Sequence, residues 1–330
     1  MVELSTAPAP VLEEEARRLA EATSGHPRIN ELPPEQGRDV LAGLQSGEDV
    51  ARPEVDEEWI TVDAGRFGID LGRFGQVRTR LVRPRGATGE LPVILYAHGG
   101  GWVLGDEHTH DRLVRELAVG ARAAVAFPLY DRAPEAHYPT QIEQLYAVGR
   151  WLVDHGRAHG LTGTRIAVCG DSAGGNMAAV LALLSAERGG VPLRAQILLY
   201  PVTDAGFDTP SYAQFADGYY LTAEEMRWFW DQYAPDPARR TEVYAAPLRA
   251  EVARLRGLVP ALVITDEADV LRDEGEAYAA KLRRAGVAVT AVRVQGTVHD
   301  FLMLDSLRDT RAARVARELA VKALQNALHG

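Results

Sequence analysis

A glycine-rich run around residue 172 carries the residue types needed for nucleophilic catalysis. Gly170-Asp171-Ser172-Ala173-Gly174, a G-x-S-x-G pattern, follows the apolar run RIAVC and precedes the helix-like run GGNMAAVLALLSAER. Glycines at these positions allow a strand to turn sharply into a helix and to hold the serine in a strained, accessible conformation. The alternatives are a plain tight turn or a phosphate-binding turn, but no second glycine or lysine has the spacing of a phosphate loop. The context therefore predicts Ser172 as a nucleophile.

A second glycine-rich run, HGGGW at 98–102, follows the apolar run PVILYA. Composition gives roughly 0.007 chance copies of H-G-G-G but roughly 0.06 of G-x-S-x-G, so this signal is the more specific one. The intermediate of acyl transfer carries an oxyanion that needs backbone N–H donors, and glycine lets the main chain approach it. We predict Gly100, Gly101 and Ala173 as these donors. His98 is expected to order the loop rather than to transfer protons.

A serine hydroxyl needs a base to take its proton, and the base needs a carboxylate to orient it. After a serine on a turn of this type, the acid and then the histidine follow in the chain. Only His299 and His329 lie downstream of Ser172. His329 is next to the last residue and is expected to fray. His299 follows the strand-like run VAVTAVRVQG and is the predicted base.

The acid should lie at the end of the strand before the one that leads to His299. The loop after the run ALVIT offers four carboxylates: Asp266, Glu267, Asp269 and Asp273. Local physical chemistry leaves all four open, since helix capping would also explain Asp269 and Asp273.

Eight apolar runs predict strands: Trp59–Val62, Val77–Val82, Val93–Ala97, Ala123–Leu129, Arg165–Cys169, Ala195–Tyr200, Ala261–Thr265 and Val287–Val294. Several are continuously apolar, as in strands buried on both faces of a parallel sheet. Helix-like segments lie between and after them: Glu107–Val119, Gln141–His159, Gly174–Glu187, Asp273–Ala285 and Asp309–Leu328. This alternation predicts an α/β fold with a mostly parallel sheet of about eight strands flanked by helices. Ligands of such sheets bind beyond the carboxyl ends of the strands.

Two segments fall outside this alternation. In residues 1–50 the pattern predicts short helices that proline and glycine interrupt. The second segment is an insertion of about sixty residues between the sixth and seventh predicted strands. The middle of that insertion, at about 205–240, is rich in aromatic residues. We expect both segments to form a helical cap over the site, although extra packing at the sheet edge is an alternative. Trp102 either lines an acyl pocket or only packs.

Five ordered motifs resemble those of the hormone-sensitive-lipase-like family of α/β-hydrolases, in particular its bacterial esterases. They are HGGGW (98–102), YDRAPE (130–135), GDSAGGN (170–176), DVLRDE (269–274) and HDF (299–301), and the resemblance spans about residues 55–325. It implies an α/β-hydrolase fold in which Asp269, the first residue of its motif, is the acid. It also implies cap helices in 1–50, a catalytic domain at 51–330 with a second cap segment at about 205–240, and a homodimer.

The chain departs from the family pattern at a few positions. Family members usually carry Pro where this chain has Val270, Gly where it has Asp300, and a Y-R-L-A-P-E motif where it has Asp131 and Arg132. No departure removes a catalytic group. Asp300, however, places a charge beside His299 and would raise its pKa if the two are close and desolvated.

The resemblance implies a serine carboxylesterase that hydrolyses short- to medium-chain carboxylic esters without a metal or cofactor. An amidase or a deacetylase of a natural product would use the same triad. A small-molecule receptor is a third reading, but the gibberellin receptors that resemble this family lack the catalytic histidine, and this chain retains His299.

Composition narrows the partners further. The net charge of −10 over 330 residues disfavours a nucleic-acid partner, because it repels phosphate. Cys169 is the single cysteine, which excludes an internal disulfide and a multi-cysteine zinc site. No apolar stretch around the HGGGW motif is long enough to span a bilayer, and no secretory signal begins the chain. We therefore expect a cytoplasmic protein that acts on a small-molecule ester.

Overall fold

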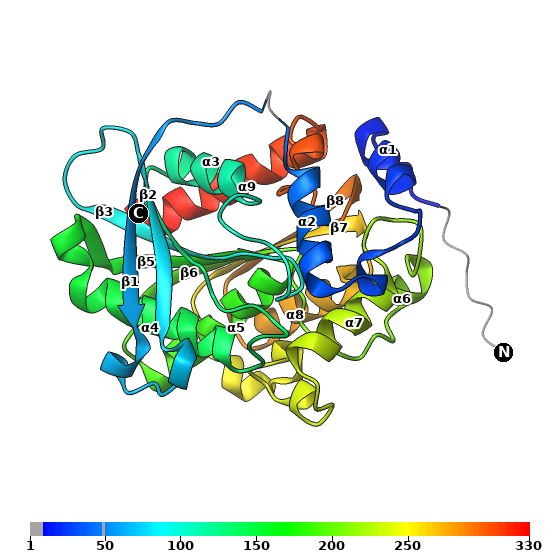
Figure 1. The fold of residues 1–330 in the computed structure, drawn as a ribbon. Coiled ribbons are helices and arrows are strands. Elements are labelled where there is room, and N and C mark those ends of the chain that lie inside the picture. Colours follow the sequence, from blue (N-terminus) through cyan, green and yellow to red (C-terminus); the bar gives the residue numbers. More distant parts are fainter. Residues whose placement is uncertain (1–8, 48–49) are drawn as a thin grey trace.

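The computed structural model describes residues 9–47 and 50–330, and its centre is one eight-stranded sheet (Figure 1). The strand order is β1-β2-β4-β3-β5-β6-β7-β8. From β4 to β8 all neighbouring strands are parallel, whereas β1 pairs with β2 and β2 with β4 in antiparallel fashion. The prediction of a mostly parallel α/β sheet of about eight strands is confirmed.

Every predicted strand is present. The bounds are β1 Val55–Asp63, β2 Gln76–Pro84, β3 Leu91–Ala97, β4 Ala124–Pro128, β5 Leu161–Asp171, β6 Leu193–Leu199, β7 Ala261–Ala268 and β8 Val289–Val298. The central strands β3, β4 and β6 are almost wholly buried, which explains their continuous apolar runs. The edge strands β1 and β8 alternate between half-buried and exposed positions along most of their length, because one face of each meets solvent.

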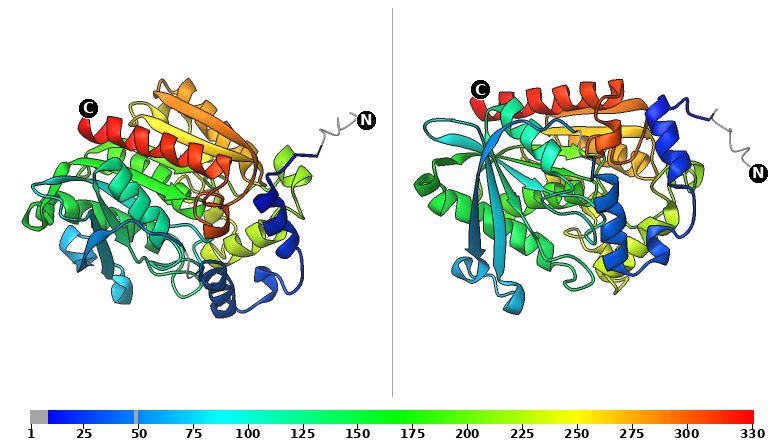
Figure 2. Two further views of the ribbon diagram at one scale, coloured as in Figure 1. Left: turned by 90° about the horizontal axis from the view of Figure 1, so that it is seen from above. Right: turned by 45° about the horizontal axis from the view of Figure 1, so that its top comes forward.

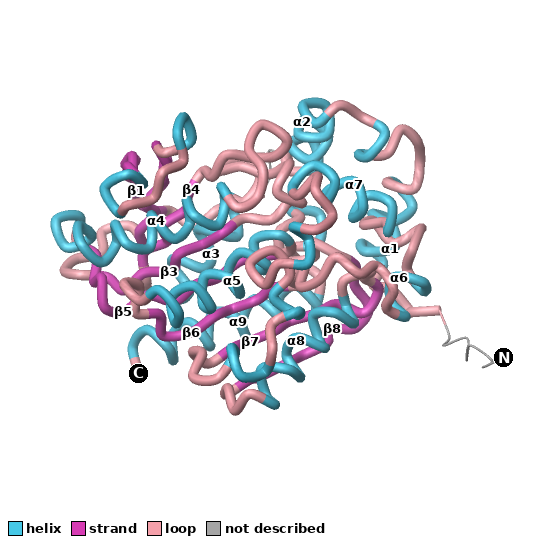
Figure 3. Tube along the Cα trace, turned by 90° about the horizontal axis from the view of Figure 1, so that it is seen from below, coloured by secondary structure: helices cyan, strands magenta, loops and turns pink. Residues whose placement is uncertain are grey.

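Helices cover both faces of the sheet (Figures 1 and 3). On one face lie α3 (Asp111–Ala121) and α9 (Arg311–His329), and on the other lie α4 (Thr140–His155), α5 (Ala173–Arg188) and α8 (Arg272–Arg284). Helix α5 is buried all round from Ala173 to Leu184, which accounts for its lack of a polar stripe. No helix in the described ranges is both long enough and apolar enough to cross a membrane.

Two local expectations were wrong. Helix α3 begins at Asp111 rather than at Glu107, because the Asp106 carboxylate accepts the N–H groups of His108 and Thr109 and holds the chain in a turn, each bond 2.9 Å long. His329 does not fray: it is the last residue of α9, and its Nε2 hydrogen-bonds the Ala121 carbonyl at 2.9 Å.

Four further helices gather at the end of the sheet where the parallel strands finish (Figure 2). They are α1 (Glu14–Ala22), α2 (Pro34–Leu44), α6 (Pro210–Gln214) and α7 (Ala223–Tyr233). The amino-terminal and inserted segments meet directly, since Arg28 pairs with Asp217 at 2.7 Å. Arg38 on α2 also donates to the Val103 carbonyl at 2.8 Å, which joins α2 to the HGGGW loop. Of the proposed 1–50 segment, residues 1–8 and 48–49 lie outside the described residues.

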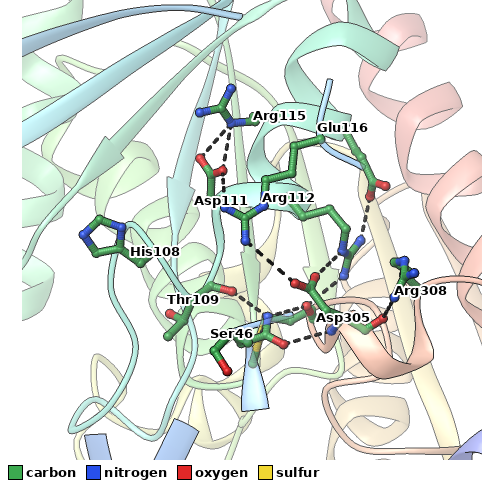
Figure 4. Close-up of polar contacts among 12 residues, drawn as sticks. Ser46, His108, Thr109, Asp111, Arg112, Arg115, Glu116, Asp305 and Arg308 are labelled. Carbon is green, nitrogen blue, oxygen red and sulfur yellow. Dashed lines mark hydrogen bonds and ion pairs between the residues drawn. The ribbon is translucent and has the colours of Figure 1, made fainter. Parts of the chain in front are cut away.

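A buried polar cluster joins α3 to the segment that follows His299 (Figure 4). Arg112 Nε donates to Asp305 Oδ1 at 2.6 Å, and its Nη2 donates to the carbonyls of Leu302 and Met303, both at 2.8 Å. Gln45, just after α2, donates to the Met303 carbonyl at 2.9 Å and accepts from the Asp305 N–H at 2.8 Å. The cluster therefore holds the chain beyond His299 against both α3 and the amino-terminal helices.

We predict that Arg112→Met lowers the free energy of unfolding by about 3 kcal/mol, because it leaves Asp305 Oδ1 and the Leu302 carbonyl buried without the donor that Arg112 supplies, although Gln45 still donates to the Met303 carbonyl. Urea denaturation followed by circular dichroism measures this. The matched control is Arg157→Met, since the Arg157–Glu90 pair is exposed; it should change the free energy of unfolding by less than about 1 kcal/mol. Equal effects of the two changes would contradict the assignment.

Candidate active site

Ser172 lies at the sharp turn between β5 and α5 and has a left-handed backbone, with φ 53° and ψ −121°. This conformation is strained for a residue with a side chain. It is held by β6, because the Ser172 N–H donates to the Leu199 carbonyl at 2.9 Å and the Ser172 carbonyl accepts from the Val202 N–H at 3.1 Å. A side chain at Gly174 would overlap the Ala97 carbonyl, which explains that glycine of the motif.

The oxyanion loop, defined here as residues 98–105, begins where β3 ends. Gly100 and Gly101 have positive φ values of 96° and 59°, and Gly100 accepts the Leu104 N–H at 2.8 Å. A side chain at Gly101 would overlap the ring of Phe229 on α7. Both glycines line the same pocket as Ser172, and Ala173 is the first residue of α5. The two glycine-rich motifs therefore meet, as their chemistry requires.

The Asp171 carboxylate connects this loop to the serine turn. It is fully buried and accepts from the Tyr96 hydroxyl at 2.6 Å, from the Gly99 N–H at 3.1 Å and from His110 Nε2 at 3.1 Å. Burial raises the pKa of Asp171, but the His110 charge and the hydrogen bonds outweigh it, so that the pKa is lowered overall. This anchor was not predicted from the sequence. The one sign of it there is that Asp171 directly precedes the serine, because the groups that bind Asp171 come from distant parts of the chain.

His98 has the loop-ordering environment that was expected. Its Nδ1 lies 2.8 Å from the Gly99 carbonyl oxygen, and its ring stacks on Tyr130 with centroids 4.1 Å apart. Burial, and then the charge of His110, lower the pKa of His98 to about 3. The imidazole is therefore neutral at physiological pH. Arg132, one of the departures from the family pattern, also serves the loop, since it donates to the Gly105 carbonyl at 2.8 Å.

The structure brings the predicted nucleophile, base and acid together in one chain of hydrogen bonds. His299 Nε2 lies 2.9 Å from Ser172 Oγ, and His299 Nδ1 lies 2.8 Å from Asp269 Oδ2. All three side chains are buried, and Ser172 is the most exposed of them at 4%. The second oxygen of Asp269 accepts the Leu271 N–H at 2.9 Å, so the carboxylate is held on both sides.

The other three carboxylates of that loop have different surroundings. Asp273 accepts the Ser211 N–H at 2.8 Å and so caps α6. Glu267 accepts the Gly296 N–H at 2.8 Å at the sheet edge. Asp266 is fully buried beside the acid and the base, and burial, followed by the charge of Asp269, raises its pKa well above the ordinary value. The environment of Asp266 therefore favours its protonated form.

Among the described residues, one group of three side chains offers ligand atoms close enough together for a metal ion: Asp266, Asp269 and His299, whose atoms lie within 4.8 Å of one another. Two of these atoms, however, already hydrogen-bond each other across the Asp269–His299 contact. The geometry thus serves an imidazole–carboxylate pair, and the expectation of no metal and no cofactor stays a prediction.

A pocket of about 350 Å³ opens above Ser172, within the size range of small-molecule sites. Its walls come from the amino-terminal segment (residues between 22 and 44), from the inserted segment (residues between 220 and 229) and from the oxyanion loop. The floor contains Ser172, His299 and Asp300. Trp102 is not on the wall: it is fully buried and stacks on Tyr233 with centroids 4.1 Å apart. Of the two roles left open for Trp102, the structure shows packing.

With this geometry in view, comparison with known proteins identifies the family. Residues 94–303 match the family described as alpha/beta hydrolase fold. The chain belongs to this family. The resemblance to its hormone-sensitive-lipase-like branch, inferred from the five motifs, is confirmed.

Characterised relatives are similar over most of their length. The chain is 40% identical to an ethyl acetate hydrolase of Pseudomonas putida, covering 71% of this chain and 73% of the relative. It is also 40% identical to the carboxylesterase NlhH of Mycobacterium tuberculosis, covering 77% and 79%. Among solved structures, a thermostable esterase from Pseudomonas putida ECU1011 superposes with a TM-score of 0.90 at 46% identity, covering 98% of this chain and 99% of the other.

We predict that the imidazole of His299 titrates above its ordinary value of about 6.5. Burial lowers the pKa of His299, but the charges of Asp269 and Asp300 raise it by more, so that the pKa is raised overall. Removing the charge of Asp300 destabilises the imidazolium, so Asp300→Asn should lower the pKa. Nitrogen-15 NMR titration, with His299→Gln to assign the signal, measures both values.

The control for this titration is Asp309→Asn, because that carboxylate is 79% exposed and forms an ion pair with Arg308. It should leave the His299 signal unchanged. A titration of His299 below 6.5, or equal pKa values in the protein and in Asp300→Asn, would show that the two acidic groups do not act on the imidazole as the geometry indicates.

Proposed function

We propose that the protein is a serine carboxylesterase that hydrolyses short- to medium-chain carboxylic esters through an acyl-enzyme intermediate. The observation that carries the proposal is the unbroken chain from Ser172 Oγ through His299 to Asp269 at the floor of a pocket. The esterase relatives support the same reaction class. A hydroxyl in this setting acts as a nucleophile because a positioned base removes its proton.

In the first half-reaction, Ser172 Oγ attacks the ester carbonyl carbon while His299 Nε2 takes the hydroxyl proton. Asp269 stabilises the imidazolium that forms and keeps Nδ1 protonated in the resting state. His299 then donates the proton to the departing alcohol oxygen, which leaves the acyl group on the serine. In the second half-reaction, a water molecule gives a proton to His299 and attacks the acyl carbon. His299 then returns this proton to Ser172 Oγ as the bond between Oγ and the acyl carbon breaks, and the carboxylic acid is released.

The negative charge of each tetrahedral intermediate needs donors that are already in place. We assign the N–H groups of Gly100, Gly101 and Ala173 to this role. Support comes from the positive φ angles of the two glycines, from their place on the pocket wall, and from the position of Ala173 at the amino end of α5, where the helix dipole favours negative charge.

The same proposal treats residues 1–50 and about 205–240 as a cap on a catalytic domain that spans 51–330. Helices α2 and α7 contribute Leu41, Leu44, Met226 and Phe229 to the pocket wall, which gives it an apolar character suited to an acyl chain. A volume of about 350 Å³ fits a short or medium chain rather than a long lipid tail. A cytoplasmic location and a homodimer remain predictions from the sequence.

We expect Ser172→Ala to reduce the hydrolysis of p-nitrophenyl acetate through octanoate by about 10⁴-fold or more, because no other group replaces the nucleophile. A phosphonate ester should add covalent mass to the unaltered protein and none to the variant. Ser306→Ala, at an exposed position, is the matched control and should retain activity. Well-folded unaltered protein that hydrolyses none of these esters would exclude the proposed function.

The role of the acid is tested by comparing Asp269→Asn with Asp266→Asn. The first removes the charge that hydrogen-bonds His299 Nδ1 and should lower kcat by about 10⁴-fold. The second should have a much smaller effect, because Asp266 has no hydrogen bond to the imidazole and its neutral form resembles an amide in shape. Steady-state kinetics measure kcat for both variants. A severe loss of kcat in Asp266→Asn alone would show that Asp266, not Asp269, is the acid.

A further inference from the structure

Asp300 is a buried carboxylate on the pocket floor that the reaction steps leave unused. It lines the same pocket as Ser172 and His299, and only 6% of its surface is exposed. Its Oδ1 is buried and has no hydrogen-bond partner within the described residues; His299 Nε2, 3.6 Å away, is too distant for a hydrogen bond. A buried acceptor without a donor is costly, so this carboxylate would gain from a donor that enters the pocket.

The backbone at Asp300, which lines the pocket, is strained. Asp300 has φ 63°, in the left-handed region, because its carbonyl accepts the N–H groups of Met303 and Leu304, each at 2.9 Å, in the turn after His299. Glycine would adopt this conformation freely, whereas a residue with a side chain adopts it under strain. A strained polar side chain at the reaction centre points to a role in function.

The distance to the base shows which part of a substrate Asp300 faces. Its Oδ1 lies 3.6 Å from His299 Nε2, the atom that must protonate the departing alcohol oxygen. Because that oxygen approaches Nε2 to about 3 Å, it lies no more than about 6.6 Å from Oδ1. A hydrogen-bond donor on the second carbon of the alcohol then comes within reach of the carboxylate.

The charge state suits such a donor. Burial raises the pKa of Asp300 to about 6, although the His299 charge opposes the rise, so the group is a carboxylate at slightly alkaline pH. The other acid on the pocket wall, Glu225, accepts from the Thr222 N–H and hydroxyl, both at 2.9 Å. Glu225 therefore already has hydrogen-bond donors within the protein, whereas Asp300 Oδ1 has none among the described residues.

We propose that Asp300 forms a subsite for the alcohol part of the ester and selects alcohols with a hydroxyl or ammonium group on the carbon next to the ester-bearing carbon, that is, monoesters of 1,2-diols and of 2-amino alcohols. The inference rests on the proposed ester hydrolysis and deepens it. The carboxylate binds the donor group while His299 protonates the adjacent leaving oxygen, so the contact is strongest as the alcohol departs.

The test compares kcat/KM at pH 8 for 2-hydroxyethyl butyrate with that for n-propyl butyrate, which has a similar size but no donor. The hydroxyl ester should be favoured by about tenfold or more, as expected for a hydrogen bond to a charged group. In Asp300→Gly this preference should disappear. A general structural fault would slow both esters alike, so the ratio isolates the contact.

Further substrates and variants distinguish hydrogen bonding by Asp300 from attraction between opposite charges. 2-Methoxyethyl butyrate keeps the oxygen but has no donor, and butyrylcholine has the positive charge but no N–H; neither should show the full preference. Asp300→Asn retains an acceptor and the turn, so it should lose preference for the 2-aminoethyl ester more than for the 2-hydroxyethyl ester. Glu225→Gln, at the other pocket acid, should leave the hydroxyethyl-to-propyl ratio unchanged.

The outcomes distinguish the two levels of the proposal. Hydrolysis of all the esters with the same ratio in unaltered protein and Asp300→Gly would overturn the subsite and leave the esterase function standing. A larger preference for butyrylcholine than for the hydroxyl ester would replace donor recognition by charge attraction and would also overturn it. No hydrolysis of any ester by folded protein would contradict the esterase function and the subsite together.

Discussion

The buried Asp171 carboxylate is the interaction on which the arrangement of the site depends. It immediately precedes Ser172 and accepts the Gly99 N–H, so one anion positions both the serine turn and the oxyanion loop. Tyr96 and His110 supply the other donors, and all of them lie in a region closed to water. Hydrogen bonds to an ion are strong in such surroundings, but a missing partner would be equally costly. The shared anchor therefore makes the two motifs a single rigid unit.

The base comes from the edge of the sheet, three strands away from β5, and is held by separate contacts. His299 follows the edge strand β8, which pairs with β7. The chain just beyond it is held by Arg112 from α3 and by Gln45 next to α2. Helix α2 also lines the pocket. The same contacts that stabilise the histidine loop thus fix the amino-terminal helices over it, which couples the shape of the pocket to the position of the base.

Four buried carboxylates lie around the reaction centre, and each is accommodated in a different way. Asp171 has three donors, and Asp269 has an imidazole and a backbone N–H. The surroundings of Asp266 favour its neutral form, whereas Asp300 has a moderately raised pKa and no donor to Oδ1. All four are aspartates, so it is their surroundings that give them different pKa values and different roles. Among the described residues, Asp266 and Asp300 both have carboxylate oxygens without a hydrogen-bond donor, but of the two it is Asp300 that lines the pocket, which is why it is the natural contact for a substrate.

The sequence by itself determined what depends on neighbours along the chain. The glycines around Ser172 and Gly100 predicted two tight backbone turns, and continuous apolar runs predicted the buried parallel strands, because both follow from local sterics and burial. The choice among the carboxylates after β7 was different: the residues left it open, the family resemblance selected Asp269, and its contact with His299 exists only because β7 and β8 lie side by side. The Asp171–His110 anchor and the exclusion of Trp102 from the pocket were likewise decided by tertiary structure. Packing between distant segments sets which polar groups meet, and no local pattern encodes that.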